Sequence, residues 1–173
     1  MQHLIDELLD ASKIKAGKLK FKKQALDLTD LISLCVENCA YMYPSYKIRK
    51  ELQDNITIYG NDERIEQVLM NLISNAVKYS PTKKEIVIRA ERNEDSAIVS
   101  VTDFGIGMQN SDQELIFERF YRASNESIMP GLGMGLYISS EIIKEHNGKI
   151  NVKSKLNEGS VFSFSLPLAT QSA

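Results

Sequence analysis

Apolar residues recur every three or four positions in several segments of the chain, which is the spacing of one buried face of an α-helix. The strongest of these patterns follows Asn61 and Asp62, either of which can cap a helix, and it stops at Ser80 and Pro81. Its apolar positions are Ile65, Val68, Leu69, Leu72, Ile73, Ala76 and Val77. The pattern therefore predicts one long amphipathic helix in the middle of the sequence.

Three further helices have the same spacing. The first is predicted over residues 4–14, with Gly17 after its last turn. The second begins with Asp30 as a cap and runs toward Pro44. The third covers residues 136–145 and is followed by His146, Asn147 and Gly148. The first of them starts at the beginning of the sequence, so we expect it to be the end of a longer helix.

Runs of alternating apolar and polar residues predict strands between these helices. The predicted strands cover residues 18–28, 48–52, 56–59, 85–91, 97–102, 149–154 and 160–166. Strands and helices in this mixed order, with neighbouring strands at both ends of the chain, predict an α+β fold. We expect a two-layer sandwich that has a mixed β-sheet with helices on one face.

The stretch from residue 103 to residue 135 is polar and rich in glycine, apart from a short helix predicted over residues 115–120. A long segment with so little secondary structure is typical of a binding lid or of disorder. Its glycines favour the lid.

Composition and charge narrow the class of protein. With 173 residues, 43% of them apolar, the chain is long enough for one folded domain with its own core. The net charge of -2 gives no long-range attraction to nucleic acid or anionic lipid, although residues 13–23 hold six lysines that form either a solvated face or a docking patch. The sequence has no run of about 18 apolar residues and no signal-like start, so we expect a cytosolic segment without direct membrane contact.

Neither the cysteines nor the histidines indicate a redox or metal site. Cys35 and Cys39 are four residues apart in an apolar helical stretch, where we expect small buried side chains rather than a disulfide. His3 is predicted to lie on a helix surface and His146 to belong to a helix end, and their separation gives no metal-site spacing.

The long central helix carries a group of polar residues near its end. Asn71 and Asn75 are four positions apart, so both amides can point to one site, with Lys78 and Tyr79 one turn further on. Amide oxygens suit Mg²⁺, which takes a few protein oxygens and completes its shell with water and phosphate, and Lys78 could add positive charge near those phosphates. Two asparagines that merely face solvent are the alternative.

Asp103, Gly105, Gly107 and Met108 follow a predicted strand directly. A carboxylate there can accept a hydrogen bond from an exocyclic amine such as that of adenine. The glycines let the backbone turn tightly and lie close to a flat ring, and an ordinary turn is the alternative. Residues 103–105 also spell the Asp-Phe-Gly triplet of eukaryotic-type protein kinases, but the other motifs of that fold are missing from the sequence.

Gly131, Gly133 and Gly135 precede Leu136 and lead into the last predicted helix. Unpaired N–H groups at the start of a helix favour an anionic phosphate. The spacing of these glycines matches neither the dinucleotide-binding motif nor the P-loop, and a flexible loop without a ligand is the alternative.

Phe117, Phe120 and Arg122 lie between the two glycine clusters. Phe117 and Phe120 are three apart on a short predicted helix, where they would anchor the loop to the body of the domain. Arg122 could pair with oxygens of a γ-phosphate. A purely structural anchor with a surface arginine is the alternative.

In their order along the chain, these four clusters resemble the N, G1, F and G2 boxes of the sensor histidine kinase catalytic domain, in the wider GHKL family that includes gyrase and mismatch-repair ATPases. The resemblance covers about residues 19–168 and implies a Bergerat-type ATP-binding fold. Residues 71–80 and 117–122 are similar to histidine kinases in particular, because gyrase-type ATPases carry a glutamate base where this chain has Asn71.

The resemblance implies a role for each matching residue. Asn75 would bind Mg²⁺, with Asn71 orienting phosphate or water, and Asn71, Lys78 and Arg122 are the candidate catalytic residues. Lys78 and Arg122 would meet phosphates, Tyr79 and Ser160 would border the nucleotide, Asp103 would accept the adenine amine, and Gly105, Gly107, Met108, Gly131, Gly133, Gly135 and Leu136 would shape the pocket and its lid.

The resemblance also implies partners. Residues 1–18 resemble the end of a dimerisation and phosphoacceptor helix hairpin, and residues 169–173 are a tail, but the sequence has no acceptor histidine in a His-Glu/Asp-x-x-x-Pro setting. We therefore expect a protein histidine kinase domain that binds Mg²⁺-ATP without labelling itself. It would phosphorylate the acceptor domain of a homodimeric parent that serves a response regulator receiver domain. A stand-alone ATPase or serine-kinase switch of the same superfamily and a non-catalytic nucleotide-binding module are the alternatives.

Overall fold

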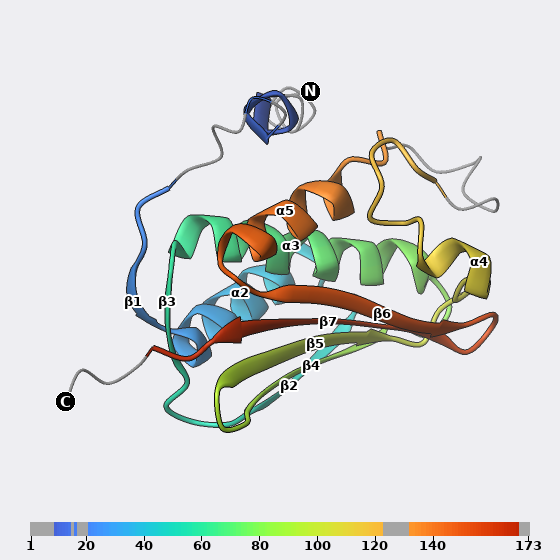
Figure 1. Ribbon diagram of the computed structural model, residues 1–173. Helices are drawn as coiled ribbons and strands as arrows, with labels where there is room; N and C mark the ends of the chain where they lie inside the picture. The colour runs from blue at the N-terminus through green and yellow to red at the C-terminus, as the bar shows by residue number, and fades with distance from the viewer. Residues whose placement is uncertain (1–8, 15, 17–20, 123–131, 170–173) are drawn as a thin grey trace.

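The computed structural model describes residues 9–14, 16, 21–122 and 132–169, which form a β-sheet and a layer of helices on one of its faces (Figure 1). The main sheet has five strands in the order β2-β4-β5-β7-β6. They are β2 (Lys47–Leu52), β4 (Glu85–Arg92), β5 (Ser96–Asp103), β6 (Lys149–Lys155) and β7 (Gly159–Pro167). β2 and β4 are parallel and the other neighbours are antiparallel, so the sheet is mixed.

Three helices cover the same face of this sheet (Figure 1). They are α2 (Leu28–Met42), α3 (Asp62–Tyr79) and α5 (Gly135–Glu145), while the short α4 (Asn110–Gln113) lies at one end of the sheet. β1 (Gln24–Asp27) and β3 (Thr57–Gly60) form a separate antiparallel pair. This arrangement confirms the predicted α+β fold with two layers.

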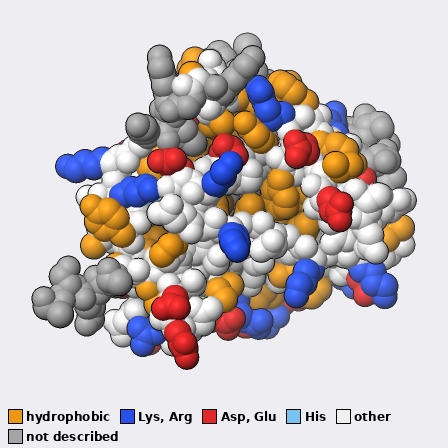
Figure 2. Space-filling model, viewed as in Figure 1, with side chains coloured by type: hydrophobic (Ala, Val, Ile, Leu, Met, Phe, Trp, Pro, Cys, Tyr) orange, Lys and Arg blue, Asp and Glu red, His pale blue; other side chains and the backbone are white. Residues whose placement is uncertain are grey.

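The surface carries charges of both signs. Figure 2 shows Lys and Arg side chains interspersed with Asp and Glu over the viewed face. Among the described residues, no helix combines the length and the apolar character that a membrane span requires.

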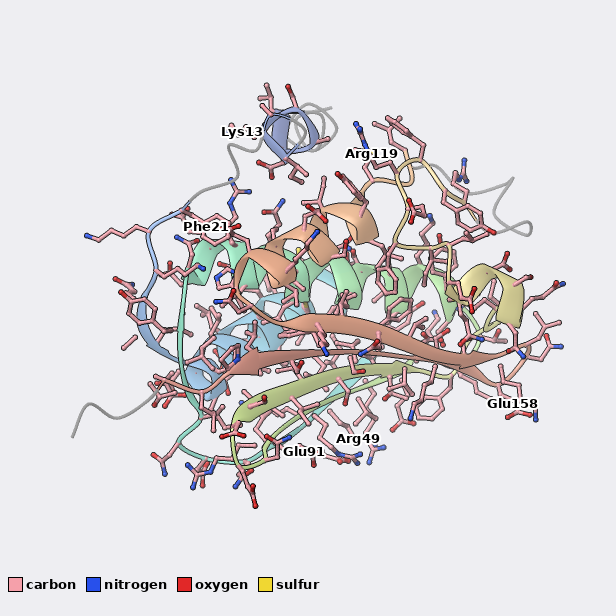
Figure 3. All side chains as sticks on the ribbon, viewed as in Figure 1. Lys13, Phe21, Arg49, Glu91, Arg119 and Glu158 are labelled. Atoms are coloured by element: carbon pink, nitrogen blue, oxygen red, sulfur yellow. The ribbon has the colours of Figure 1, made fainter. Side chains whose placement is uncertain are left out.

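The core lies between the helices and the sheet, and the central strands β5 and β7 alternate buried with half-buried side chains. In β5, Val99 is buried and Ser100 is half-buried, and Val99 is paired with the buried Phe164 of β7. Figure 3 shows Arg49 and Glu91 on the opposite side of the sheet, which no helix of the described chain covers. The described helices therefore cover one face of the sheet only, and the core cluster with Ile86 and Ile88 lies on that face.

The start of α3 lies where the sequence predicted it. Asn61 caps the helix, because its Oδ1 accepts the N–H of Arg64 at 3.0 Å. The backbone N–H of Asn61 donates to Nε2 of His146 at 3.0 Å, and Nδ1 of His146 lies 2.7 Å from the carbonyl oxygen of Ile142. A neutral ring with its proton on Nδ1 satisfies both contacts. His146 thus belongs to the end of α5, as predicted, and burial lowers its pKa below the ordinary value of 6.5.

The start of α2 differs from the prediction. Asp27 caps this helix rather than Asp30, because Oδ1 of Asp27 accepts the N–H groups of Thr29 at 2.8 Å and Asp30 at 3.1 Å. Leu28 is wholly buried and belongs to the helix, so β1 is much shorter than the predicted strand over residues 18–28. The alternation of the sequence continues through Leu28 and so concealed the earlier cap.

The short helix after β5 is also displaced from its predicted place. It is α4, whereas residues 115–120 form turns, one of which is closed by a bond from the N–H of Ile116 to the carbonyl oxygen of Asp112 at 3.0 Å. Phe120 has a φ of 60°, a left-handed conformation that an α-helix does not accommodate. The prediction of a helix over residues 115–120 is therefore wrong.

The described part of the N-terminal helix, residues 9–14, contacts α3. Asp10 is buried, and its Oδ2 accepts Nη1 of Arg64 at 2.6 Å and Nε2 of Gln67 at 3.0 Å. The predictions for His3 and Gly17 lie outside the described residues.

Cys35 and Cys39 are wholly buried in α2 and are free thiols, which confirms the prediction. Burial raises the pKa of the Cys35 thiol to about 12 and that of Cys39 to about 11. Both side chains therefore act as small apolar groups of the core.

Candidate functional site

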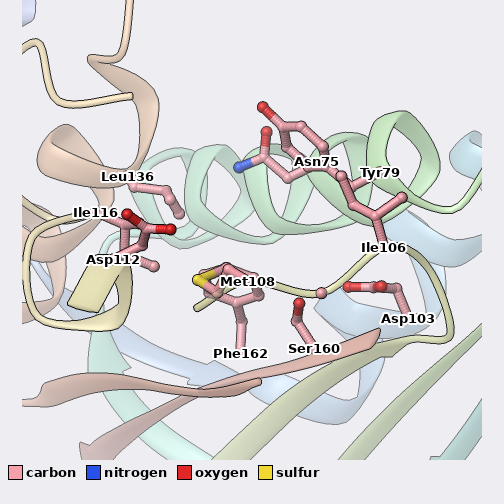
Figure 4. A pocket seen from close by; sticks show the side chains of 11 residues that line it. Asn75, Tyr79, Asp103, Ile106, Met108, Asp112, Ile116, Leu136, Ser160 and Phe162 are labelled. Atoms are coloured by element: carbon pink, nitrogen blue, oxygen red, sulfur yellow. The ribbon is translucent and has the colours of Figure 1, made fainter. Parts of the chain in front are cut away.

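A pocket lies between α3, the bend that follows β5 and the first residues of β7 (Figure 4). The residues of its lining that the sequence predicted are Asn75, Tyr79, Asp103, Gly107, Met108, Leu136 and Ser160, and the others are Ile106, Asp112, Ile116 and Phe162. Segments from both halves of the chain thus meet at one cavity.

Asp103 ends β5 and points into the pocket (Figure 4). It is only 3% exposed, and its Oδ1 accepts the N–H of Gly105 at 2.9 Å. Burial raises the pKa of Asp103 above its ordinary value, while hydrogen bonds from Gly105 and Ser160 oppose that rise. The carboxylate is a desolvated acceptor, so a ligand that brings an N–H donor to it gains a strong hydrogen bond.

Ser160 stands directly opposite Asp103 in the pairing of β5 with β7. The Oγ of Ser160 lies 3.0 Å from the Oγ of Ser154. The hydroxyl group of Ser154 donates to the carbonyl oxygen of Gly159 at 2.9 Å and accepts the N–H of Met108 at 2.9 Å. These hydroxyl groups hold the bend after β5 against the turn between β6 and β7.

The bend itself needs glycine at two positions. A Cβ at residue 105 would lie 1.9 Å from the carbonyl oxygen of Tyr79, and the N–H of Ile106 donates to that oxygen at 3.0 Å. Gly107 has a φ of 60°, and a Cβ there would lie 2.0 Å from the carbonyl oxygen of Lys155. The bend therefore packs tightly between the end of α3 and the β6–β7 turn.

α3 presents Asn75 and Tyr79 to the pocket (Figure 4). Asn71, one turn earlier, lies against α5, since its Nδ2 donates to Oγ of Ser139 at 3.0 Å. A Cβ at Gly135 would lie 2.4 Å from Oδ1 of Asn71. The structure therefore brings Asn75 into the pocket lining and places Asn71 beside the start of α5.

The start of α5 is the predicted anion site. Gly135 is its first residue, and the residue before it, Met134, makes no side-chain cap hydrogen bond. Gly133 has a φ of 67°, and a Cβ there would lie 2.6 Å from the carbonyl oxygen of Tyr121. Gly131 lies outside the described residues. A helix start of this kind offers N–H groups and a positive dipole end to an anion.

The two predicted cationic groups lie outside the pocket lining. The ammonium group of Lys78 is 4.7 Å from the centre of the Tyr79 ring. Arg122 is exposed and is the last described residue before residues 123–131. Lys78 and Arg122 each have further interactions within the domain.

The two phenylalanines of the loop behave differently. Phe117 packs against the core, as an anchor should. Phe120 is 57% exposed, and the guanidinium group of Arg119 lies 5.5 Å from its ring centre. The predicted anchoring role is therefore right for Phe117 and wrong for Phe120, whose left-handed backbone goes with a ring left largely in solvent.

Four residues of the lining were not predicted: Ile106, Asp112, Ile116 and Phe162. The alternation of β7 could have identified Phe162, which is two residues from Ser160 and thus on the same face of the strand. Asp112 lies in a polar stretch with no motif of its own, so the sequence carried no signal for it.

The comparisons with known proteins agree with this pocket. A family model described as histidine kinase-, DNA gyrase B- and HSP90-like ATPase matches residues 60–170, which is more than half of the chain and includes the whole pocket lining. The signal transduction histidine-protein kinase ArlS of Staphylococcus aureus (strain USA300) is 32% identical over 162 residues, or 92% of this chain. The chain spans 36% of the length of that relative.

Solved structures of histidine kinases have the same fold. The catalytic domain of histidine kinase ThkA is 29% identical with a TM-score of 0.73, covering 85% of this chain and 98% of that one. Full-length ShkA in complex with AMPPNP gives a TM-score of 0.86 over 99% of this chain and 36% of its own, and at 24% identity this likeness concerns the fold alone. The chain therefore belongs to the histidine kinase-, DNA gyrase B- and HSP90-like ATPase family, as an ATP-binding catalytic domain of the histidine kinase type.

Proposed function

We propose that this domain binds Mg²⁺-ATP beside Asp103 and supplies the γ-phosphate to a histidine on the dimerisation and phosphoacceptor domain of its parent kinase. The observation that carries the proposal is the buried Asp103 carboxylate next to a bend that only glycine fits. A desolvated carboxylate at the end of a strand suits the amine of adenine, and the two glycines let the bend beside it pack tightly between α3 and the β6–β7 turn, where it forms part of the pocket wall. The ShkA structure, which contains AMPPNP, supports a nucleotide ligand for this fold.

At the base end of the pocket, Asp103 accepts the adenine amine while Ser160 and Tyr79 border the nucleotide. Gly105 and Gly107 form the bend along the ring. Met108 and Leu136, both half-buried in the lining, give the ring apolar contacts.

At the phosphate end, Asn75 would offer its amide oxygen to Mg²⁺, and Asn71 would orient phosphate or water from its place beside α5. When bound, Mg²⁺ neutralises charge that develops on the phosphates during transfer. Within the described parts of the chain, no group of three or more His, Cys, Asp or Glu side chains could hold a metal ion. Because Mg²⁺ readily keeps waters and phosphate oxygens as ligands, one protein amide is compatible with its chemistry.

Positive groups complete the phosphate end. Lys78 and Arg122 would pair with phosphate oxygens, and Gly131, Gly133 and Gly135 would bring the chain close to the phosphates at the start of α5.

The transfer needs a second domain. The bond between the γ-phosphorus and its bridging oxygen breaks, a phosphorus–nitrogen bond to the imidazole forms, and a base on the acceptor domain removes the imidazole proton. Neither His3 nor His146 stands in a His-Glu/Asp-x-x-x-Pro sequence, so both the acceptor and that base would come from the partner domain. We also propose that the parent kinase is a homodimer and that this domain lies in its cytoplasmic part. The parent would pass the phosphate to a response regulator receiver domain.

Two measurements test the proposal. The first is equilibrium binding of ATP and GTP to the 173-residue chain, with Mg²⁺ or with EDTA. We expect ATP to bind more tightly than GTP, because guanine has a carbonyl oxygen where adenine has its amine, and we expect Mg²⁺ to strengthen binding of ATP. The second is incubation with radiolabelled ATP, alone and with a supplied phosphoacceptor domain.

We expect an acid-labile label on the acceptor domain and none on this chain. Failure to bind ATP would refute the proposal. ATP binding without any transfer would favour a non-catalytic nucleotide-binding module, and an acid-stable phosphoserine on a partner protein would favour a serine-kinase switch. An acid-labile phosphohistidine on this chain alone would contradict the dependence on a second domain.

A further inference from the structure

Asp112 is a second buried carboxylate of the pocket, at the opposite end from Asp103 (Figure 4). It lies in α4 and is 6% exposed. Its N–H donates to the carbonyl oxygen of Gln109 at 3.1 Å, and its own carbonyl oxygen accepts the N–H of Ile116 at 3.0 Å. The backbone of Asp112 is therefore held on both sides, which gives its carboxylate a defined position.

The carboxylate of Asp112 is bonded to a residue nine positions further along the chain. Its Oδ1 accepts the hydroxyl group of Tyr121 at 2.8 Å. The ring of Tyr121 is half-buried and packs against the core. A hydroxyl group that donates to a carboxylate makes a charge-assisted bond, and here that bond ties the residue before Arg122 to the wall of the pocket.

A backbone hydrogen bond also holds the residue before Tyr121. The N–H of Phe120 donates to the carbonyl oxygen of Gly133 at 3.1 Å. A Cβ at Gly133 would also lie 2.6 Å from the carbonyl oxygen of Tyr121, so the two chain segments are in close contact. Gly133 fixes the main chain at this point, and Asp112 fixes the direction of the Tyr121 side chain.

We propose that Asp112, acting through Tyr121, is a positioning residue that holds Arg122 in place for the phosphates of the nucleotide. The inference rests on the proposed function, because it deepens how the same pocket recognises a triphosphate. It requires an acceptor oxygen at residue 112, since the Tyr121 hydroxyl group is the donor, and it does not require the negative charge.

The experiment compares the dissociation constants of ATP and adenosine for the full chain and for variants of these residues. Tyr121→Phe and Asp112→Ala should each weaken ATP binding by about fivefold, the effect of one ordinary hydrogen bond, and leave adenosine binding unchanged. Asp112→Asn is the matched control, because an amide oxygen still accepts the hydroxyl group through a neutral bond, and it should lose less ATP affinity than Asp112→Ala. In an Arg122→Ala background, Tyr121→Phe should cause no further loss.

Thermal unfolding of each variant separates these effects from misfolding, and Tyr121→Phe keeps the half-buried ring in any case. The inference is overturned if Tyr121→Phe leaves ATP affinity unchanged, or if it weakens ATP and adenosine equally, as a purely structural role would. The inference is also overturned if Asp112→Asn weakens ATP binding as much as Asp112→Ala does. The same holds if Tyr121→Phe causes its full loss of ATP affinity in the Arg122→Ala background. If the unchanged chain binds no ATP, the proposed function fails and this inference fails with it, a result distinct from normal ATP binding that Tyr121→Phe does not weaken.

Discussion

Replacement of Asp103 by Asn removes one negative charge from the pocket and changes the shape of the side chain very little. The carboxylate is 3% exposed and accepts the N–H of Gly105 at 2.9 Å. The amide oxygen of Asn can accept the same N–H, so the bend after β5 should stay in place. The substitution therefore tests whether the charge of this acceptor recognises the nucleotide.

The expected loss follows from the kind of hydrogen bond. A hydrogen bond to a charged group contributes about 1.5–3 kcal/mol, and a neutral one contributes about 1 kcal/mol. The amide oxygen of the introduced Asn is expected to face Gly105, so its nitrogen faces the adenine amine and the hydrogen bond to adenine is lost. Since each 1.4 kcal/mol changes the dissociation constant about tenfold, Asp103→Asn should weaken ATP binding by about tenfold. GTP should not lose affinity, because guanine offers no amine at that position.

Asp103→Asn should leave the stability of the domain unchanged or increase it, although it weakens ATP binding. Burial raises the pKa of Asp103, which means that the folded domain without nucleotide disfavours the ionised carboxylate. Removal of the charge should therefore leave the free energy of unfolding unchanged or raise it. Loss of ATP affinity without loss of stability would separate recognition from misfolding.

The assay is competition of ATP and GTP against a fluorescent nucleotide, with thermal unfolding of the same samples. Asp54→Asn is the matched control, because Asp54 is exposed and lies outside the pocket lining. Unchanged ATP affinity in Asp103→Asn, or an equal loss for ATP and GTP, would refute the recognition of adenine by this carboxylate.

Three further predictions concern the bend, His146 and the thiols. Gly105→Ala should abolish most ATP binding in titration calorimetry, because its Cβ would overlap the carbonyl oxygen of Tyr79, and normal binding would contradict the tight bend. The free energy of unfolding should fall as the pH drops below 6.5, because the pKa of His146 is lower in the folded domain than in the unfolded chain, which therefore binds more protons at these pH values. Urea unfolding at several pH values should show this pH dependence, and His146→Asn should reduce it. Cys35 and Cys39 should react with a thiol reagent only in denaturant, because both are buried with raised pKa values, and rapid reaction of the native domain would contradict their burial.

The sequence predicted the layers of the fold because burial itself sets the periodicity of apolar residues. In α3, Leu69, Leu72 and Ile73 repeat at helical spacing and are all wholly buried against the sheet and the other helices. The cap at Asn61 is a local hydrogen bond, which local sequence can specify. These layers and this cap were therefore predictable, whereas the equally local cap at Asp27 was missed because the strand-like alternation continues through Leu28.

Other features of the site depend on contacts between distant segments. Asn71 is bonded to Ser139, which lies 68 positions further along the chain, and no spacing rule predicts that pair. Asn71 and Asn75 share a helix face only approximately, because four residues turn a helix by about 40° more than one full turn. That difference is enough for Asn75 to line the pocket while Asn71 lies against α5.

The end of α3 explains why the separate motifs form one pocket. The last carbonyl groups of a helix have no partner within it and need donors from elsewhere. The carbonyl oxygen of Tyr79 accepts the N–H of Ile106 at 3.0 Å, and the hydroxyl group of Tyr46 donates to the carbonyl oxygen of Val77 at 2.9 Å. The bend after β5 therefore caps the helix that carries Asn75.

This shared hydrogen bond couples the two ends of the proposed nucleotide site. A shift of the bend that carries Asp103 would weaken the bond from Ile106 to Tyr79 and loosen the last turn of α3. Asn75 stands one turn before Tyr79, so its amide would move with that turn. We therefore expect the proposed recognition of the base by Asp103 and the proposed role of Asn75 as a magnesium ligand to be coupled, because the carbonyl group of Tyr79 joins the bend to the last turn of α3.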